Sequence, residues 1–133
     1  MNTKKKLSLE RSFFEKFKSQ AALRENQTAI VIEENGIEIT YEDLSSDVEK
    51  IACHLWSSGV RNGDVVASQL PNGYLALLMF IASTALGIKY APCAVDDPST
   101  VERLARCIPV KYLVLLEPSE HFGETGITTI SLP

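Results

Sequence analysis

The feature that most constrains the fold is a regular alternation of short apolar runs and helical patterns in the second half of the chain. Three runs have the length of strands, and the segments between them have the end signals of helices. The expected order is strand 64–70, helix 74–86, strand 89–95, helix 99–107, strand 111–116 and a further strand at 127–132. Because helices are the usual crossovers between parallel strands, this order predicts an α/β fold with a mostly parallel sheet.

A helix and a β-hairpin are expected to precede this alternation. Residues 9–20 place one apolar stripe on a helix, made of Leu9, Phe13, Phe14 and Phe17. Asn35-Gly36 is a favoured two-residue loop of type I′, with a positive φ at both positions. Counting outward from that loop pairs Ile32 with Ile39 and opposes the like charges of Glu33 and Glu38.

Side chains with capping ability stand at the expected helix ends. Thr40 precedes Asp43 by three residues and is expected to cap a helix that ends at Gly59. The apolar stripe of that helix is Leu44, Val48, Ile51, Ala52 and Leu55, widened by Trp56. Asn72 is the expected N-cap of helix 74–86, and Ser99 with Glu102 forms a capping box for the next helix.

The longest stretch without a charged side chain, residues 65–88, raises the question of a membrane span. Pro71-Asn72-Gly73 interrupts it, so the helical part is too short to cross a bilayer and is interpreted as a buried core helix. The basic residues Lys4 to Lys6 are not followed by the apolar segment of a signal peptide. No membrane association is therefore expected.

Composition indicates one globular domain. The chain has 133 residues, 45% of them apolar and 23% charged, which is enough for an independent core. Residues 1–8 are expected to be a flexible basic N-terminus and residues 9–133 a single α/β domain. A net charge of −4 gives the chain no excess of positive charge that would attract nucleic acid, so no nucleic-acid partner is expected. Cys53, Cys93 and Cys107 are expected to be reduced and mostly buried, which predicts a cytoplasmic location.

No constellation of residues predicts catalytic chemistry. The seven glycines do not form a phosphate-binding loop, because neither G-x-G-x-x-G nor G-x-x-x-x-G-K-[ST] occurs. Asp96 and Asp97 are interpreted as the polar entry to a helix, and His54 and His121 as surface or packing residues. The sequence predicts no catalytic, no cofactor-binding and no metal-binding residue.

Five short motifs in a fixed order nevertheless resemble those of one superfamily. They are Thr40-Tyr41 with Leu44, Gly59-Val60 with Gly63-Asp64 and Val66, Leu70-Pro71-Asn72, Gly87 with Tyr90 and Pro92, and Asp97-Pro98 with Glu102-Arg103-Leu104. This series, over about residues 10–117, is similar to the N-terminal portion of adenylate-forming (AMP-binding) enzymes. That superfamily includes acyl-CoA synthetases, luciferases and the adenylation domains of nonribosomal peptide synthetases. The last motif is shorter here than in the family by one or two residues.

The resemblance implies an ATP- and Mg²⁺-dependent ligase that joins a carboxylate to AMP. The family residues that perform this chemistry lie beyond the matched motifs, so the chain alone is expected to bind neither ATP nor Mg²⁺ and to be inactive. We interpret it as an incomplete N-terminal scaffold portion of such a ligase. The alternative is a standalone, non-catalytic binding or docking module derived from the fold.

The chain is not expected to be a self-sufficient monomer, whereas a stable monomer would favour the standalone module. The apolar helix 74–86 has more apolar surface than a short sheet can cover, and a truncated sheet leaves open edges. The expected partners are the remainder of the adenylation enzyme as a separate chain, or a second copy of this chain.

Overall fold

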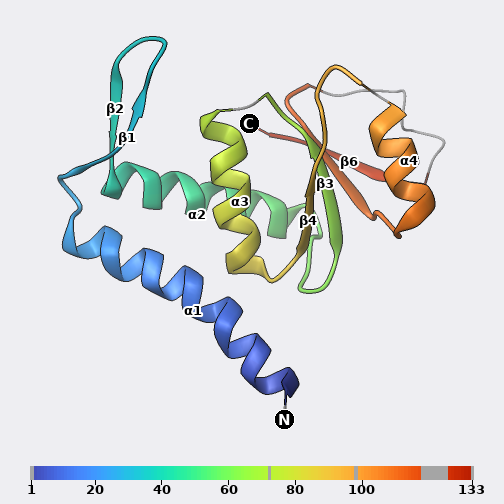
Figure 1. Cartoon of the computed structure of the whole chain (residues 1–133), viewed down its shortest axis with the longest axis horizontal. Helices are drawn as coiled ribbons and strands as arrows, with labels where there is room; N and C mark the ends of the chain where they lie inside the picture. The colour runs from blue at the N-terminus through green and yellow to red at the C-terminus, as the bar shows by residue number, and fades with distance from the viewer. Residues whose placement is uncertain (1, 72, 98, 118–125, 133) are drawn as a thin grey trace.

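The computed structural model describes residues 2–71, 73–97, 99–117 and 126–132 (Figure 1). Its helices are α1 (Asn2–Leu23), α2 (Tyr41–Ser57), α3 (Tyr74–Leu86) and α4 (Ser99–Cys107). Its strands are β1 (Thr28–Ile32), β2 (Ile37–Thr40), β3 (Val65–Gln69), β4 (Lys89–Pro92), β5 (Tyr112–Leu115) and β6 (Thr128–Ser131). The predicted α/β class is confirmed, and the predicted order of elements matches.

Four strands form a parallel sheet in the order β4-β3-β5-β6. Every residue of β3 and β5 is buried, as expected for central strands that are covered on both faces. Val66 lies opposite Tyr90 of β4 on one side and opposite Tyr112 of β5 on the other. The parallel arrangement predicted from the alternation of elements is therefore correct.

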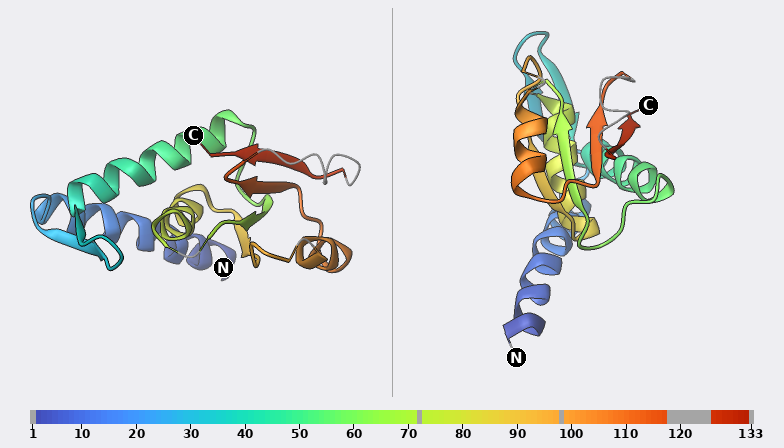
Figure 2. Two further views of the ribbon diagram at one scale, coloured as in Figure 1. Left: turned by 90° about the horizontal axis from the view of Figure 1, so that it is seen from above. Right: turned by 90° about the vertical axis from the view of Figure 1, so that its right-hand side faces the viewer.

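Successive side chains of the strands enter two separate cores. Val66 and Val114 face a large core that includes buried residues of α2 and α3. Ala67 and Leu113 face a smaller core with Val101 of α4. In Figures 1 and 2, α1, α2 and α3 accordingly lie on one face of the sheet and α4 lies on the other. This is the period of two that a doubly covered sheet requires.

The hairpin forms, but its predicted register and turn are wrong. Ile32 pairs with Ile37 and Val31 with Glu38, so the loop has four residues, 33–36, and the register shifts by two. Gly36 has a φ of 69°, whereas Asn35 lacks the positive φ that a type I′ turn needs. The Asn35 side chain instead accepts a hydrogen bond from the backbone N–H of Ile37 (3.0 Å). This register also separates Glu33 from Glu38, which removes the unfavourable opposition of like charges.

Both predicted ends of α2 are confirmed. The Thr40 hydroxyl accepts a hydrogen bond from the Asp43 N–H (3.1 Å). At the other end, the N–H of Gly59 bonds to the carbonyl of Trp56 and the N–H of Val60 to that of Leu55. These two bonds form a Schellman motif, in which Gly59 supplies a φ of 107°.

Trp56 does not widen the buried stripe of α2. Its side chain is 51% exposed, and the guanidinium of Arg61 lies 3.6 Å from the centroid of its ring. Arg61 is held there by hydrogen bonds from its guanidinium to the carbonyls of Trp56 and Val60 (2.8 Å each). A residue of the same chain therefore covers this large aromatic side chain.

The helices α3 and α4 start at the predicted residues, whereas the start of α1 and the N-cap of α3 differ from the predicted ones. The helix α1 begins at Asn2 rather than at residue 9, and the division of the chain at residue 8 stays a prediction. Gly73 occupies the N-cap position of α3, and Asn72 lies outside the described residues. The acceptor at the start of α4 is Asp97, whose carboxylate accepts from the N–H (3.1 Å) and hydroxyl (2.6 Å) of Ser99. The capping box predicted for Ser99 and Glu102 stays a prediction.

Candidate functional site

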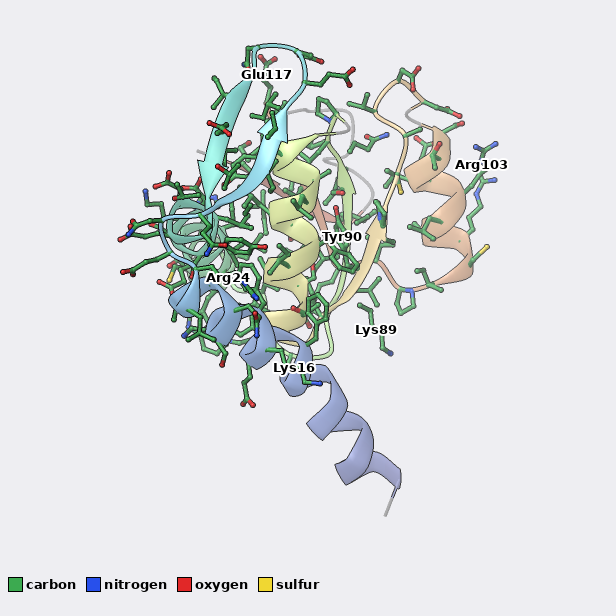
Figure 3. All side chains as sticks on the ribbon, turned by 60° about the vertical axis from the view of Figure 1, so that its left-hand side comes forward. Lys16, Arg24, Lys89, Tyr90, Arg103 and Glu117 are labelled. Atoms are coloured by element: carbon green, nitrogen blue, oxygen red, sulfur yellow. The ribbon has the colours of Figure 1, made fainter. Side chains whose placement is uncertain are left out.

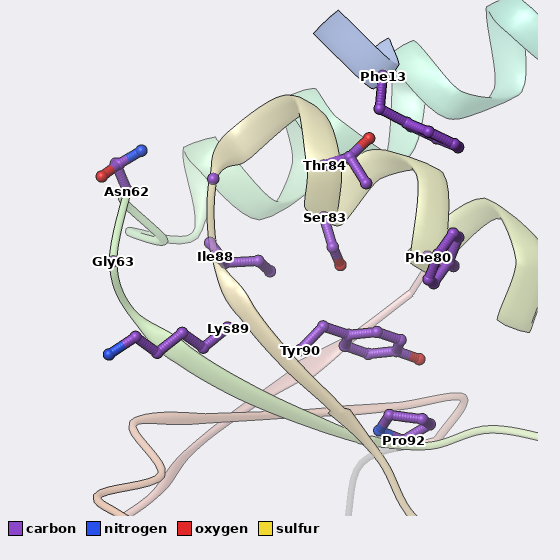
Figure 4. Close-up of a pocket in the computed structure, with 11 residues that line it drawn as sticks. Phe13, Asn62, Gly63, Phe80, Ser83, Thr84, Ile88, Lys89, Tyr90 and Pro92 are labelled. Atoms are coloured by element: carbon purple, nitrogen blue, oxygen red, sulfur yellow. The ribbon is translucent and has the colours of Figure 1, made fainter. Parts of the chain in front are cut away.

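A hollow in the described part of the chain lies between α1, α3 and β4 (Figure 4). Its volume is about 640 Å³. Its lining residues come from all three elements and from the turn after α2, and they are Phe13, Asn62, Gly63, Phe80, Ser83, Thr84, Gly87, Ile88, Lys89, Tyr90 and Pro92. We call it the α1–α3–β4 cavity.

One end of the cavity is aromatic. Phe13 of α1 and Phe80 of α3 meet edge to face, with their ring centroids 6.2 Å apart and an angle of 86° between their planes. Both rings remain about half exposed, at 48% and 52%. Tyr90 of β4 adds a third ring on the floor (Figure 4). These rings meet because the helix α3 is apolar nearly all round, so the face that turns away from the sheet is also apolar.

The hydroxyl groups in the wall already have partners inside the protein. Ser83 donates to the carbonyl of Met79 and Thr84 to that of Ile81, each at 2.6 Å. The hydroxyl of Tyr90 lies 2.6 Å from that of Ser68 on β3, and burial raises the pKa of this phenol above its usual range. Ser83 and Thr84 therefore offer the cavity no free hydroxyl donor.

The other end of the cavity is polar. Asn62 and Gly63 belong to the turn before β3, and the N–H of Gly63 donates to the carbonyl of Gly87 at the end of α3 (2.9 Å). Lys89 starts β4 beside this turn, and its chain runs along the side opposite Phe80 (Figure 4). In Figure 3 its ammonium group extends away from the body of the protein.

A second, smaller hollow of about 250 Å³ lies at the carboxyl ends of β3 and β5. Gln69 at the end of β3 donates from its side chain to the carbonyls of Ala94 (2.9 Å) and Asp97 (3.1 Å). The buried amide thereby fixes the loop after β4. Because its donors are engaged in this way, the residue acts as a structural support.

The residues weighed as candidates for chemistry have structural roles. Asp97 lies just before α4 and pairs with Arg103 (3.3 Å), and the bonds from Ser99 hold the pKa of its carboxyl below the usual range. The His54 ring bonds to the backbone carbonyl of Ser131 (2.8 Å) and ties α2 to β6. Cys53 and Cys107 are exposed and Cys93 is half-buried, so the prediction that the thiols are mostly buried is wrong. His121 and Gly123 lie outside the described residues.

The residues that the structure describes do not form a site that fits ATP with Mg²⁺. A triphosphate needs clustered backbone N–H groups or several cations, and Mg²⁺ needs oxygen ligands. The lining of the α1–α3–β4 cavity holds one lysine and no carboxylate. Over residues 13–71, 73–97, 99–117 and 126–132, no group of three or more His, Cys, Asp or Glu side chains is placed to hold a metal ion. No helix in these ranges is both long enough and apolar enough to cross a membrane.

The parallel sheet has α1, α2 and α3 on one face, and the β1–β2 hairpin lies between α1 and α2. This arrangement resembles the N-terminal portion of adenylate-forming enzymes. The N-terminal subdomain of Klebsiella oxytoca NpsA, in complex with 3-hydroxybenzoyl-AMSN, superimposes with a TM-score of 0.74 at 16% identity. Escherichia coli MenE, with a bound analogue of OSB-AMS, gives 0.70 at 17%. Each covers 86% of this chain, which in turn covers 28% of the NpsA chain and 25% of the MenE chain.

The sequence model of the family described as "AMP-binding enzyme" matches residues 17–111. The chain therefore belongs to the AMP-binding enzyme family, as its five motifs predict. It is 38% identical over 65 residues to acetoacetyl-CoA synthetase of Caenorhabditis elegans, and 27% over 120 residues to cyclosporin synthetase simA of Tolypocladium inflatum. These matches cover 49% and 90% of this chain but only 9% and 1% of the relatives.

Sequence patterns did not predict the cavity. Its aromatic residues, Phe13, Phe80 and Tyr90, stand far apart in the sequence and meet only in the folded chain. The available signal was the apolar character of residues 74–86, which predicts exposed apolar surface without showing what lies opposite it.

Proposed function

We propose that this chain is the N-terminal scaffold portion of an ATP-dependent ligase that forms acyl or aminoacyl adenylates. In this proposal the chain is catalytically incomplete alone and works with the remainder of the enzyme. The observation that carries the proposal is the family match over residues 17–111, combined with a described structure that offers no fitting site for ATP and Mg²⁺. A bound ATP·Mg²⁺ would supply the activated α-phosphate in the complete ligase.

The roles of the matched motif residues support a scaffold function. Thr40 caps α2, Gly59 ends it, and Gly87 ends α3 in the left-handed region. Tyr90 bonds to Ser68 across the two strands, and Asp97 accepts a hydrogen bond from Ser99, the first residue of α4. Each of these residues holds the fold of this portion in place and leaves chemistry to other parts of a ligase.

The proposed partner is the remainder of the adenylation enzyme, supplied as a separate chain, or else a second copy of this chain. Among the described strands, β4 and β6 each have a neighbour on one side only. Such edges carry backbone N–H and C=O groups available for pairing, which makes them suitable for extending the sheet across an interface. The negative net charge gives no support for a nucleic-acid partner. The free thiols of Cys53, Cys93 and Cys107 support a cytoplasmic location.

The test is ATP–pyrophosphate exchange with Mg²⁺ and a panel of amino, fatty and aromatic acids. The purified chain should show only the background of a heat-inactivated sample, because nothing in it stabilises the charge that develops on the α-phosphate. Co-purification with the product of the neighbouring gene, if that gene encodes a Ser/Thr/Gly-rich loop with a lysine, should restore exchange. Exchange by the isolated chain contradicts the proposed incompleteness.

A standalone binding module is the second candidate, and the α1–α3–β4 cavity favours it. The cavity exists without any further chain, and its volume lies within the range of small-molecule sites. An unrelated neighbouring gene, together with a stable monomer in sedimentation equilibrium at several concentrations, would support the module over the scaffold.

A further inference from the structure

We infer that the α1–α3–β4 cavity binds a small molecule with an apolar, ring-containing body and a single negative charge. This inference concerns binding by the chain alone and does not depend on the proposed ligase function. It rests on the size of the cavity, the separation of its apolar and polar ends, and the rigidity of its walls.

Size and wall chemistry define the body of the ligand. A volume of about 640 Å³ suits a small organic molecule. The hydroxyls of Ser83, Thr84 and Tyr90 form hydrogen bonds within the protein. The part of the ligand beside them is therefore expected to be apolar. Aromatic rings on two sides favour a flat ring, which can stack on one and meet the edge of another.

The position of Lys89 defines the charge of the ligand. Among the described residues, the lining contains this one cation and no acidic side chain. The ion pairs found between described residues involve Lys18, Arg103 and Lys111, and none of them includes Lys89. The amide of Asn62 lies at the same end and adds hydrogen-bonding capacity. A ligand with its ring beside Phe80 would place an anionic group at this polar end. The exposed Lys89 side chain, whose ammonium extends outward in Figure 3, would turn toward the cavity to meet it.

The walls are held in place before any ligand arrives. Lys89 donates its backbone N–H to Asp64 (2.9 Å), which fixes the start of β4, and the Gly63–Gly87 bond fixes the turn opposite. Phe13 and Phe80 already contact one another and form an aromatic roof. A site that is ordered in advance loses little conformational entropy on binding.

The test uses 2-naphthalenesulfonate and its uncharged analogue, 2-naphthalenesulfonamide, titrated into the isotope-labelled full chain at low ionic strength. The sulfonate should shift the amide resonances of Thr84, Lys89 and Tyr90 in a saturable manner. The sulfonamide should bind about two- to fivefold more weakly, the range for one exposed charge pair. Added salt should reduce this difference.

Matched variants locate the site. Thr84→Phe should fill the cavity and abolish saturable binding of both probes, whereas the nearly isosteric Thr84→Val should leave it intact. Lys89→Gln should remove the preference for the sulfonate, while Lys50→Gln, an exposed change on α2 outside the cavity, should preserve it. Circular dichroism melts verify that each variant is folded. If Thr84→Phe does not fold, Phe80→Ala gives a second test, because it removes one of the two aromatic rings and should weaken the binding of both probes.

Three results overturn the inference. The first is non-saturable shifts that spread to exposed apolar residues elsewhere, such as Ile37. The second is equal affinity for the two probes. The third is concentration-dependent shifts of the cavity resonances without ligand, together with a dimer in sedimentation, because they would identify a second copy of the chain as the occupant.

Discussion

The helices α2 and α3 lie on the same face of the sheet, yet they meet water in opposite ways. Both turn buried residues inward, among them Val48 and Leu55 of α2 and Leu78 and Met79 of α3. The outward face of α2 is mostly polar, and its one large exposed ring, Trp56, is covered by Arg61. The outward face of α3 carries Leu77 and Phe80, which are 36% and 52% exposed.

This difference shows which of the two helices leaves apolar surface exposed in the described fold. The ends of α2 are specified by side chains and by Gly59, as in a helix adapted to the surface of a domain. The helix α3 has no side-chain cap at its start and no charged residue along its length. Its outer face carries the exposed side chains of Leu77 and Phe80, which the proposed ligand or the proposed further chain would cover.

The largest expected effect concerns the inward faces, where the two helices are alike. Leu55→Ala and Met79→Ala each remove a fully buried side chain from the same core. Each should lower the free energy of unfolding by about 2–5 kcal/mol, the range for large-to-small core substitutions. Urea denaturation measures this, with the exposed Leu23→Ala as the control. A much smaller loss for Met79→Ala would show that α3 packs more loosely than α2.

The glycines that end the two helices should differ in their tolerance of a side chain. A Cβ at Gly59 would lie 2.9 Å from the hydroxyl of the buried Tyr112, whereas a Cβ at Gly87 would meet the exposed side-chain amide of Asn62. Both sites have positive φ, which costs about 1–2 kcal/mol for alanine.

Gly59→Ala should therefore destabilise the chain by about 2–3 kcal/mol and Gly87→Ala by about 1–2 kcal/mol. Urea midpoints of the two variants give the comparison. Adding Asn62→Ala should partly rescue Gly87→Ala and leave Gly59→Ala unchanged. If Gly59→Ala and Gly87→Ala lose the same free energy of unfolding, and Asn62→Ala changes neither loss, then backbone strain alone determines the cost of alanine at both positions.

The sequence predicted local structure well where one short signal decides it. Thr40 caps the first turn of α2, and Gly59 ends the same helix. Neither role depends on a distant segment, so the predicted limits of α2 were correct. The hairpin register was wrong because Asn35-Gly36 fits both a two-residue and a four-residue loop. A shift of two keeps Ile30, Ile32 and Ile39 on the face that packs against the core, so the apolar pattern cannot distinguish the two registers.

Features that depend on distant segments could not be predicted. Arg61 over Trp56 and Phe13 against Phe80 depend on how a turn and a helix approach, and periodicity does not encode that approach. For the same reason the α1–α3–β4 cavity was missed, although the excess apolar surface of α3 was expected.

The next effect tests the capped start of α2. Thr40→Ala removes the acceptor of the Asp43 N–H and should cost about 1 kcal/mol, whereas Thr40→Ser keeps an equivalent oxygen and should cost only a few tenths. Thermal or urea unfolding measures both variants. If they lose the same amount, the methyl group of Thr40 matters more than its hydroxyl, and α2 is no better specified at this end than α3.

A hydrogen bond from the first turn of α3 to α2 should make stability depend on alkaline pH. The Tyr74 hydroxyl donates to Asp47 (2.7 Å), and burial, followed by this bond and the Asp47 charge, raises the pKa of Tyr74. The folded state therefore holds the phenolic proton more tightly than the unfolded state, whose pKa is about 10. The stabilisation is complete below that value and is lost as the pH rises above it.

Tyr74→Phe should cost about 0.5–1.5 kcal/mol at neutral pH and should flatten the decline in urea midpoint between about pH 9 and pH 11. Asp47→Asn is the matched control, because it keeps an acceptor and removes the charge. A decline as steep in Tyr74→Phe as in the parent would mean that other groups control the alkaline limb.

The most direct test of the comparison comes from the two half-exposed rings, whose replacement should have only a small effect on stability. Trp56 and Phe80 are 51% and 52% exposed, so replacing either with glutamine should cost below about 1–1.5 kcal/mol, roughly half the value of a fully buried aromatic side chain. Their effects on binding should differ, because Arg61 covers Trp56 whereas Phe80 borders the cavity. The fluorescence of 1-anilinonaphthalene-8-sulfonate, an apolar anionic dye, should fall in Phe80→Gln and stay at the parent level in Trp56→Gln. If both variants reduce dye binding equally, exposure alone governs it, and α3 has no outward face distinct from that of α2.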